Sequence, residues 1–272
     1  MNSYAEVAQE IAREAGALLA GYFQRRVNFK LKGEFDLVTE ADLASERLLL
    51  ERLRTRFPSH AIVAEESGGH RAESEFCWYL DPLDGTTNFA HGFPMFCVSM
   101  GLEQAGEMIA GVIYDPMRDE MFVAERGAGA WLNNRRVSVS QAATLADCLA
   151  ATGFPSWKRH ESINVHFFHQ VAMATHGVRR AGSAALDIAY VACGRFDLFW
   201  EFGLNPWDVS AGVLLVTEAG GSLTDMHGEK HKLRSPHVLA DNGLVHGEVL
   251  QLFGEVFKGQ YRVPLPVVNK QP

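Results

Sequence analysis

Two aspartates, Asp81 and Asp84, stand three residues apart in the string Asp-Pro-Leu-Asp-Gly-Thr-Thr-Asn (81–88), directly after the apolar run Phe76–Leu80. Carboxylates at the end of a buried strand repel each other and lose hydration unless a cation compensates, and oxygen ligands suit a hard ion such as Mg²⁺. Gly85 allows close approach of the backbone to an anion, and Thr86 offers a hydroxyl and an N–H group at an expected helix start. The alternative is an Asp-rich turn that caps the next helix. We favour a metal site beside a phosphate-binding loop.

Two further acids, Glu65 and Asp208, could complete an all-carboxylate site. Glu65 follows the apolar run Ala61–Ala64 and precedes Asp81 by sixteen residues, at the end of what could be the neighbouring strand. Asp208 stands in Asn-Pro-Trp-Asp-Val-Ser (205–210), where a helix should begin. Taken alone, Glu65 is typical of a solvated loop and Asp208 of a helix N-cap. The N-cap and the ligand interpretations are compatible, because a capping carboxylate can also face a metal.

Other chemical patterns are weaker. His166 and His169 are spaced i, i+3 on an expected helix, but without nearby acidic or cysteine partners a solvated or core-edge face is favoured over a metal site. The pair Arg179-Arg180 is interpreted as a surface pair rather than as a phosphate-steering one. The pattern Gly-x-Ser-x-Gly of a nucleophile elbow is absent from the sequence.

Helical periodicity dominates the first part of the chain. Apolar residues recur at helical spacing over Ser3–Phe23, and Ser3 with Glu6 forms the pattern of a capping box. A second helix should follow Thr39 and end at Phe57, because Pro58 disfavours helical geometry at the residue before it. These two helices precede the candidate site.

Short runs rich in β-branched and aromatic residues follow these helices. Ala61–Ala64 and Phe76–Leu80 are predicted to be buried strands, each ending on an acid. Further strands are expected near Phe96–Leu102, Met108–Tyr114 and Glu120–Glu125, before a turn at Asn133-Asn134, and together they suggest an antiparallel meander. The first half, residues 1–147, is therefore predicted to be α+β and to carry most of the candidate ligands.

The second half, residues 148–272, alternates strands and helices in an α/β pattern. We expect helices near residues 162–174, 183–193, 208–218 and 244–257, and strands near residues 148, 178, 196–201, 223 and 238. No Pro/Gly/Ser-rich linker separates the halves, so they should pack as one compact unit. The end of the chain from Val263 is expected to be a loosely held tail.

Composition and charge exclude several classes of protein. With 47% hydrophobic and 21% charged residues the chain is typical of globular proteins, and no apolar run approaches the roughly 20 residues of a membrane helix. Acidic residues interrupt the N-terminus where a secretory signal would be apolar, and the four cysteines lack CxxC spacing. We expect a soluble, cytoplasmic protein with reduced thiols. The formal charge of −8 makes nucleic acid an unlikely partner, although a metal and backbone N–H groups can still capture a small phosphate.

Five segments together resemble the inositol monophosphatase family. In chain order they are DLVTEAD (36–42), AEES (64–67), DPLDGTTN (81–88), RAGSAALD (180–187) and PWDVSAG (206–212). The match runs in order over nearly the whole chain, from about residue 3 to residue 242. The resemblance implies a layered αβαβα sandwich, usually a homodimer, with lithium-sensitive hydrolysis that depends on Mg²⁺, two or three ions per site. It is specific for the family and much less so for the substrate.

The resemblance also implies roles for individual residues. The carboxylates of Glu65, Asp81, Asp84 and Asp208, with the backbone carbonyl of Leu83, match the metal ligands of the family. Residues that act on the attacking water or bind the phosphate and the substrate are matched by Asp42, Gly85, Thr86, Gly182, Ser183, Ala184, Glu201 and again Asp208. Thr86 and Glu65 would orient and deprotonate the water, with Asp42 hydrogen-bonded nearby. Two residues depart from the family pattern: Ala64 stands where Gly is common, and Ser183 stands where Thr is common. Only the change at Ser183 could affect substrate specificity.

The expected reaction is direct hydrolysis of a phosphomonoester without a covalent enzyme intermediate. Glu201 would accept hydrogen bonds from substrate hydroxyls, which favours a phosphorylated polyol such as myo-inositol 1-phosphate. Fructose 1,6-bisphosphate, histidinol phosphate and phosphorylated nucleotides stay open as substrates. A non-enzymatic alternative is a regulator that binds RNA or a transcription factor on the same fold, although the acidic charge and the intact ligand set weigh against that as the only role.

Overall fold

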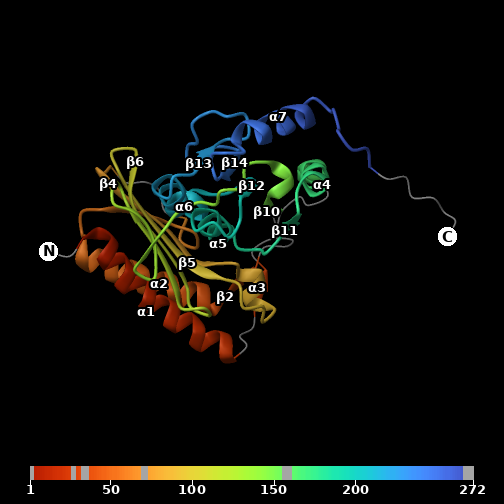
Figure 1. Ribbon diagram of the computed structural model, residues 1–272. Helices are drawn as coiled ribbons and strands as arrows, with labels where there is room; N and C mark the ends of the chain where they lie inside the picture. Colours follow the sequence, from red (N-terminus) through yellow and green to blue (C-terminus); the bar gives the residue numbers. More distant parts are fainter. Residues whose placement is uncertain (1–2, 26–28, 32–36, 69–72, 155–160, 266–272) are drawn as a thin grey trace.

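Alternating layers of helices and sheets organise the chain (Figure 1). The computed structural model describes residues 3–25, 29–31, 37–68, 73–154 and 161–265. Helices α1 (Tyr4–Arg25) and α2 (Glu40–Arg56) cover one face of a seven-stranded sheet, and α5 (Ala184–Ala192) and α6 (Pro206–Glu218) lie between that sheet and a five-stranded one. The outer layer consists of α4 (Asn164–Ala174) and α7 (His246–Phe257). The predicted αβαβα sandwich is confirmed.

The seven-stranded sheet runs in the order β3-β4-β5-β6-β7-β8-β9. Its strands are β3 (Ala61–Ala64), β4 (Phe76–Asp84), β5 (Cys97–Gln104), β6 (Glu107–Asp115), β7 (Glu120–Glu125), β8 (Gly129–Leu132) and β9 (Arg135–Val137). Only β3 and β4 pair in parallel, and the remaining pairs form the predicted antiparallel meander. The predicted turn joins β8 to β9, where Asn133 and Asn134 both adopt positive φ, of 46° and 63°. Asparagine tolerates this left-handed conformation better than most residues.

The five-stranded sheet has the order β11-β10-β12-β14-β13. Its strands are β10 (Leu149–Thr152), β11 (Gly177–Arg179), β12 (Leu198–Phe202), β13 (Ser222–Thr224) and β14 (His237–Asp241). β10 pairs in parallel with β11 and β12, whereas β14 pairs antiparallel with β12 and β13. All the helices and strands predicted for this half are present. The short helix α3 (Thr86–Ala90) begins at Thr86, where a helix start was expected, whereas three short elements were not predicted: β1 (Phe29–Leu31), β2 (Leu37–Thr39) and a 3₁₀ turn (Leu145–Asp147).

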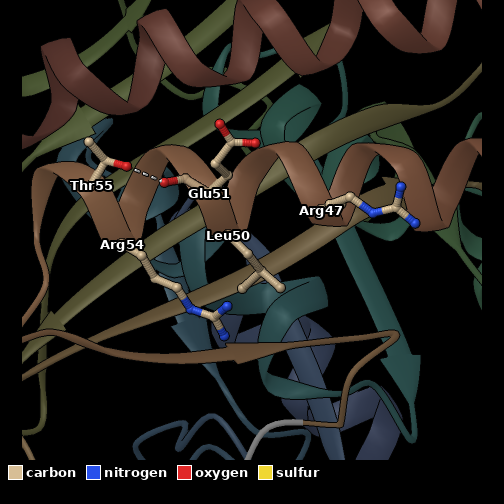
Figure 2. Close-up of a pocket in the computed structure, with 5 residues that line it drawn as sticks. All are labelled: Arg47, Leu50, Glu51, Arg54 and Thr55. Carbon is tan, nitrogen blue, oxygen red and sulfur yellow. Dashed lines mark hydrogen bonds between the residues drawn. The ribbon is translucent and has the colours of Figure 1, made fainter.

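Capping boxes begin both N-terminal helices. At α1 the Ser3 N–H donates to the Glu6 carboxylate at 2.8 Å, and the Glu6 N–H donates to the Ser3 hydroxyl. At α2 the Thr39 hydroxyl accepts from the first turn, while the Thr39 N–H donates to the carboxylate of Asp42 at 2.8 Å. Asp42 is fully buried, so the cap fixes this carboxylate inside the protein. The outer side of α2 is exposed and carries Arg47 and Arg54 beside Leu50 (Figure 2).

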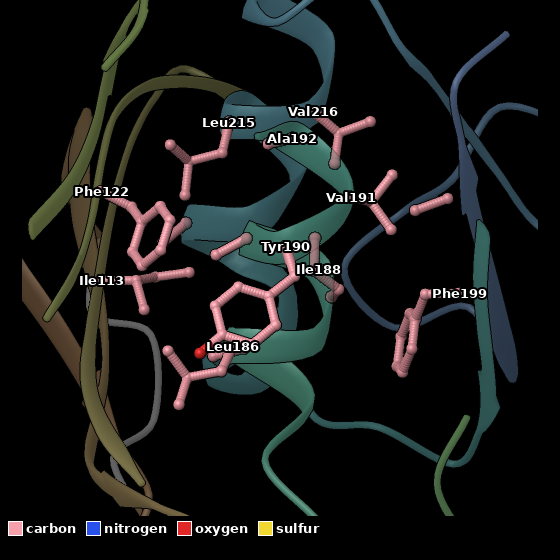
Figure 3. Packing of buried hydrophobic residues seen from close by; sticks show 14 of the residues in the cluster. Ile113, Phe122, Leu186, Ile188, Tyr190, Val191, Ala192, Phe199, Leu215 and Val216 are labelled. Carbon is pink, nitrogen blue, oxygen red and sulfur yellow. The ribbon is translucent and has the colours of Figure 1, made fainter. Parts of the chain in front are cut away.

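The central helices join the two sheets through one continuous apolar core. Ile113 and Phe122 of the large sheet, Tyr190 of α5 and Phe199 of the small sheet belong to the same buried cluster (Figure 3). Close approach of α6 to the large sheet requires glycine: a Cβ on Gly111 would lie 2.7 Å from the carbonyl oxygen of Ala211. The first sheet ends at Val137 and the second begins at Leu149. Treating residues 1–147 and 148–272 as two halves of one unit stays a prediction.

The region around Val263 differs from the expected loose tail. The Gln170 side-chain amide donates to the Val263 carbonyl at 2.7 Å, and the Val263 N–H donates back to the Gln170 side chain at 3.1 Å. This reciprocal pair holds Val263 against α4, and the expected tail beyond residue 265 lies outside the described residues. Within the described ranges, no helix is long and apolar enough to cross a membrane.

We predict that Gly111→Ala destabilises the fold by about 1–3 kcal/mol, because the new methyl group would press α6 away from the sheet. Gly254→Ala in α7 is the matched control, since a Cβ there meets no atom within 4 Å and alanine favours a helix by up to ~1 kcal/mol. Urea unfolding of the two variants measures both effects. An unchanged midpoint for Gly111→Ala would contradict the packing described for α6.

Candidate active site

The parallel pair β3 and β4 brings two of the predicted acids to one edge of the large sheet. Ala64 and Leu80 are register partners, and the Glu65 N–H donates to the Leu80 carbonyl at 3.2 Å. Glu65 therefore follows β3 directly, and Asp81 lies beside it within β4, near the carboxyl end of that strand. This is the arrangement that the sequence predicted for them.

The chain between Asp81 and Asp84 leaves the regular register of β4. Pro82 lies in this stretch and has no N–H to donate, while the Leu83 N–H donates to the Asp81 carboxylate at 2.9 Å. Asp84 then reaches the start of α5, where its carboxylate accepts hydrogen bonds from the Ser183 hydroxyl at 2.5 Å and from the Ala185 N–H at 2.8 Å. Asp84 thus links the large sheet to the central helical layer.

Asp208 occupies the first turn of α6. Its carboxylate accepts a hydrogen bond from the Asn205 N–H at 2.7 Å and completes a capping box. Asp208 therefore takes part in the cap as the partner of the N-cap residue Asn205, and not as the N-cap itself. Its role as a metal ligand stays a prediction.

The electrostatics of the cluster are unfavourable to four ionised groups. Burial, followed by the charges of Glu65, Asp84 and Asp208, raises the pKa of Asp81 well above its ordinary value. Burial and then the charge of Asp84 raise the pKa of Asp208 to about 7. A bound cation would relieve this repulsion, because it stabilises the ionised form of each acid.

The donor set fits a hard cation in type and charge, since it consists of carboxylate oxygens with carbonyl and hydroxyl oxygens nearby. Among the residues that the structure describes, however, no three aspartate, glutamate, histidine or cysteine side chains converge closely enough to enclose an ion as they stand. The carboxylates of Asp84 and Asp208 are held instead by the local donors described above. These donors bond the Oδ2 atom of each carboxylate, which leaves further carboxylate lone pairs able to accept an ion.

Thr86 and Asp42 form a buried hydrogen-bonded pair beside the cluster. The Thr86 hydroxyl lies 3.0 Å from Asp42 Oδ1 and 3.0 Å from the carbonyl oxygen of Leu83. Its single proton can be given to only one of these acceptors at a time. Burial raises the pKa of Asp42, while hydrogen bonds from Thr39 and Thr86 lower it. The α2 cap therefore fixes the acceptor that orients the Thr86 hydroxyl.

Gly85 shapes the loop that leads into α3. Its φ of 94° is left-handed, and a Cβ there would lie 2.8 Å from the carbonyl oxygen of Met95. No other residue fits this position without strain. The first N–H groups of a helix have no partner within the helix, so this loop can offer them to an anion.

The Asn88 side chain links the 81–88 loop and the segment before β5 to the segment before α5. No role was predicted for this residue. Its side-chain amide donates to the carbonyl oxygens of Met95 and Ala181, both at 2.8 Å, and lies 3.2 Å from that of Gly182. Gly182 and Ser183 are thereby held next to the 81–88 loop, and Ala184 follows as the first residue of α5. The asparagine at the end of the string was a visible signal, but its partners are about ninety residues away in sequence.

Glu201 lies on β12 and faces the same region. Burial, followed by the charges of Asp208 and Asp84, raises its pKa to about 8, and the charge of Arg180 opposes this shift. Arg180 is exposed, as predicted for a surface pair, and its charge still acts on Glu201. A Cβ on Gly153 would overlap the Glu201 carboxylate, so this glycine makes room for it. Neither relation could be seen in the sequence.

Asp187 of α5 is another buried acid that was not assigned a role. Burial and the charges of Glu201 and Asp84 raise its pKa well above the ordinary value. Its Oδ1 atom is buried without a hydrogen-bond partner among the described residues. The charged groups near the candidate site therefore extend beyond the predicted set.

Comparison with known proteins agrees with this arrangement. Residues 1–257 match the model of the inositol monophosphatase family. The chain is 43% identical to an inositol-1-monophosphatase of Synechocystis sp. over 92% of its length and 88% of the relative. It is also 43% identical to a Nus factor SuhB of Pseudomonas aeruginosa, over 89% of its length and 92% of the relative.

Solved structures show the same fold. Extragenic suppressor protein suhB of Bartonella henselae superposes with a TM-score of 0.87 at 40% identity, covering 91% of this chain and 97% of that one. The Thermotoga maritima IMPase superposes with a TM-score of 0.86 at 36% identity, covering 93% and 98%. The matches extend over nearly the whole chain in sequence and in structure. The resemblance predicted from its five motifs is therefore confirmed, and the chain belongs to the inositol monophosphatase family.

Proposed function

We propose that this chain is a Mg²⁺-dependent phosphomonoesterase that hydrolyses myo-inositol 1-phosphate. The observation that carries the proposal is the cluster of Glu65, Asp81, Asp84 and Asp208 beside the α3 loop and the start of α5. Membership of the family supports a phosphatase, and family members are in general metal-dependent. The acids supply cation binding, while the loop supplies N–H groups to a phosphate.

Within this proposal, the four carboxylates and the Leu83 carbonyl hold the metal ions. When bound, Mg²⁺ would lower the pKa of a ligated water and stabilise negative charge on the phosphate and the leaving alkoxide. N–H groups at Gly85 and Thr86 would bind the phosphate oxygens. Little else is needed for in-line displacement beyond positioning and electrostatics.

Thr86, Asp42 and Glu65 would act on the attacking water. When the Thr86 hydroxyl donates its proton to Asp42, its lone pairs are left to accept a hydrogen bond from the water. Glu65, which is only half-buried, would accept the proton that the water loses. The arrangement gives Thr86 a directional role that a cap residue alone would not have.

The substrate hydroxyls would meet Glu201 and the segment Gly182 to Ala184. The Glu201 carboxylate occupies the space that the absence of a Cβ at Gly153 leaves. The Ser183 hydroxyl is fixed by its hydrogen bond to Asp84. A carboxylate facing the site accepts hydrogen bonds from vicinal hydroxyls, which favours a polyol over a plain alkyl or aryl phosphate. Homodimer formation, a cytoplasmic location and lithium sensitivity stay predictions.

A second candidate function rests on the relatives named Nus factor SuhB, one of which matches at the same 43% identity as the inositol-1-monophosphatase. It is a regulatory role through binding of RNA or a transcription factor. This role is compatible with catalysis, since the candidate ligand set is complete in the sequence. A substrate assay therefore tests the first function without deciding the second.

The direct test is a phosphate-release assay with Mg²⁺ over myo-inositol 1-phosphate, fructose 1,6-bisphosphate, histidinol phosphate and an adenosine monophosphate. We expect the highest kcat/KM on myo-inositol 1-phosphate, with activity lost in chelator and lowered by Li⁺. Asp84→Asn, which removes one charge with little change in shape, should abolish turnover. Wild-type turnover in excess chelator, or a fully active Asp84→Asn protein, would contradict the metal-dependent mechanism.

Thr86→Ala should lower kcat by about 10²–10⁴-fold while the Mg²⁺ requirement stays nearly constant, because the hydroxyl orients the water and binds no cation. Thr86→Ser keeps the hydroxyl and should retain much of the activity. Mg²⁺ titrations and thermal melts of both variants provide the measurement. A Thr86→Ala protein that is only destabilised, with wild-type kcat, would show that Thr86 is a structural residue alone.

Glu201→Gln should raise KM for myo-inositol 1-phosphate by about tenfold, the equivalent of one charged hydrogen bond, and leave p-nitrophenyl phosphate nearly unaffected. Gly153→Ala should shift selectivity in the same direction, because its methyl group displaces the Glu201 carboxylate. The ratio of kcat/KM on the two substrates is the readout. Equal losses on both substrates would remove Glu201 from the hydroxyl-binding face.

A further inference from the structure

A separate cleft lies along α6, between that helix, the β5–β6 hairpin and the loop that precedes β14. Its volume is about 790 Å³, and none of the four clustered carboxylates lines it. This size falls within the range of small-molecule sites, roughly 300–1,000 Å³. The cleft is therefore large enough to hold a ligand of its own.

The acids of this cleft are already committed to partners within the fold. Glu103 accepts from the Tyr79 hydroxyl and the Gly106 N–H, at 3.1 and 3.2 Å. Glu218 accepts from the N–H groups of Gly127 and Gly129, at 2.7 and 2.8 Å. These hydrogen bonds supply the donors that the two carboxylates need.

The third acid, Glu107, is shared between two cations. It pairs with Arg126 and Lys230, each at 3.2 Å. Nearby His231 also lines the cleft, and burial lowers its pKa to about 4, so its ring is neutral at pH 7. Glu107 with its two cations leaves one positive charge, which is outweighed by the negative charges of Glu103 and Glu218, since the donors named above for these two acids are all neutral.

Lys232 and Arg234 are different. Both line the cleft, both are exposed, and neither side chain makes an ion pair or hydrogen bond with any residue in the described part of the chain. The charge left for a ligand is therefore positive. The lining also includes apolar side chains from three elements: Met108, Val213, Leu214, Leu223 and Leu233.

We propose that this cleft binds a small organic anion whose apolar body lies against α6 and whose acidic group is bound by Lys232 and Arg234. Charge complementarity requires an acidic group, and the apolar wall favours a hydrocarbon or aromatic body over a bare inorganic ion. The concave shape favours a small molecule over a flat protein surface. The site is independent of phosphate hydrolysis.

Binding of 8-anilinonaphthalene-1-sulfonate, which has this chemistry, tests the proposal by fluorescence titration of the full chain. We expect saturable binding with one site per chain. Lys232→Glu combined with Arg234→Glu should weaken Kd by at least about tenfold, as expected for loss of charge-assisted contacts. The matched control is Arg47→Glu combined with Arg54→Glu, which changes the charge equally on the exposed side of α2 (Figure 2) and should leave Kd within about twofold.

Thr217→Trp provides a second variant that fills the cleft without changing its charge. Thr217 is exposed, and its hydroxyl bonds only within its own helix among the described residues, so the fold should tolerate the change. It should abolish dye binding while circular dichroism stays unchanged. Absence of saturable binding to the wild type, equal weakening in the Arg47/Arg54 control, or unchanged binding in Thr217→Trp would each overturn the proposal.

Discussion

Repulsion among four clustered carboxylates, of which Asp81 is buried and the other three are partly buried, is the constraint on which the site depends. Asp81 and Asp208 titrate above their ordinary range because burial removes water and the neighbouring acids add negative charge. Such a cluster persists only if a rigid framework holds the acids together. The parallel strands β3 and β4 fix two of them, and the first turn of α6 fixes a third.

Several carboxylates of the site also stabilise the fold, because they accept hydrogen bonds at the starts of helices. Asp208 is part of the α6 cap, Asp42 is part of the α2 cap, and Asp84 accepts hydrogen bonds at the start of α5. Helix N-termini favour negative charge, so each acid is partly stabilised where it stands. Asn88 and the glycine contact of α6 then join the two sheets around the cluster. The site therefore depends on all of the inner layers.

Local patterns in the sequence predicted much of this arrangement. The apolar run before Asp81, the capping box of Ser3 with Glu6 and the helical periodicity of residues 3–23 are local features, and the strand and the helix that they predict are confirmed. The relation of Glu201 to Gly153 and of Asn88 to Gly182 could not be predicted, because it arises where segments distant in sequence pack together. The antiparallel pair β1 and β2 was not predicted. The roles of Asp42 and Glu201 came from family resemblance rather than from any local pattern.

The central claim is that the carboxylate cluster is a divalent-cation site. Anomalous scattering from crystals of this chain grown with Mn²⁺, a substitute for Mg²⁺ with a usable signal, tests it most directly. We expect peaks within ligand distance of Glu65, Asp81, Asp84 and Asp208. A fully ordered cluster without a peak at saturating Mn²⁺ would contradict the claim.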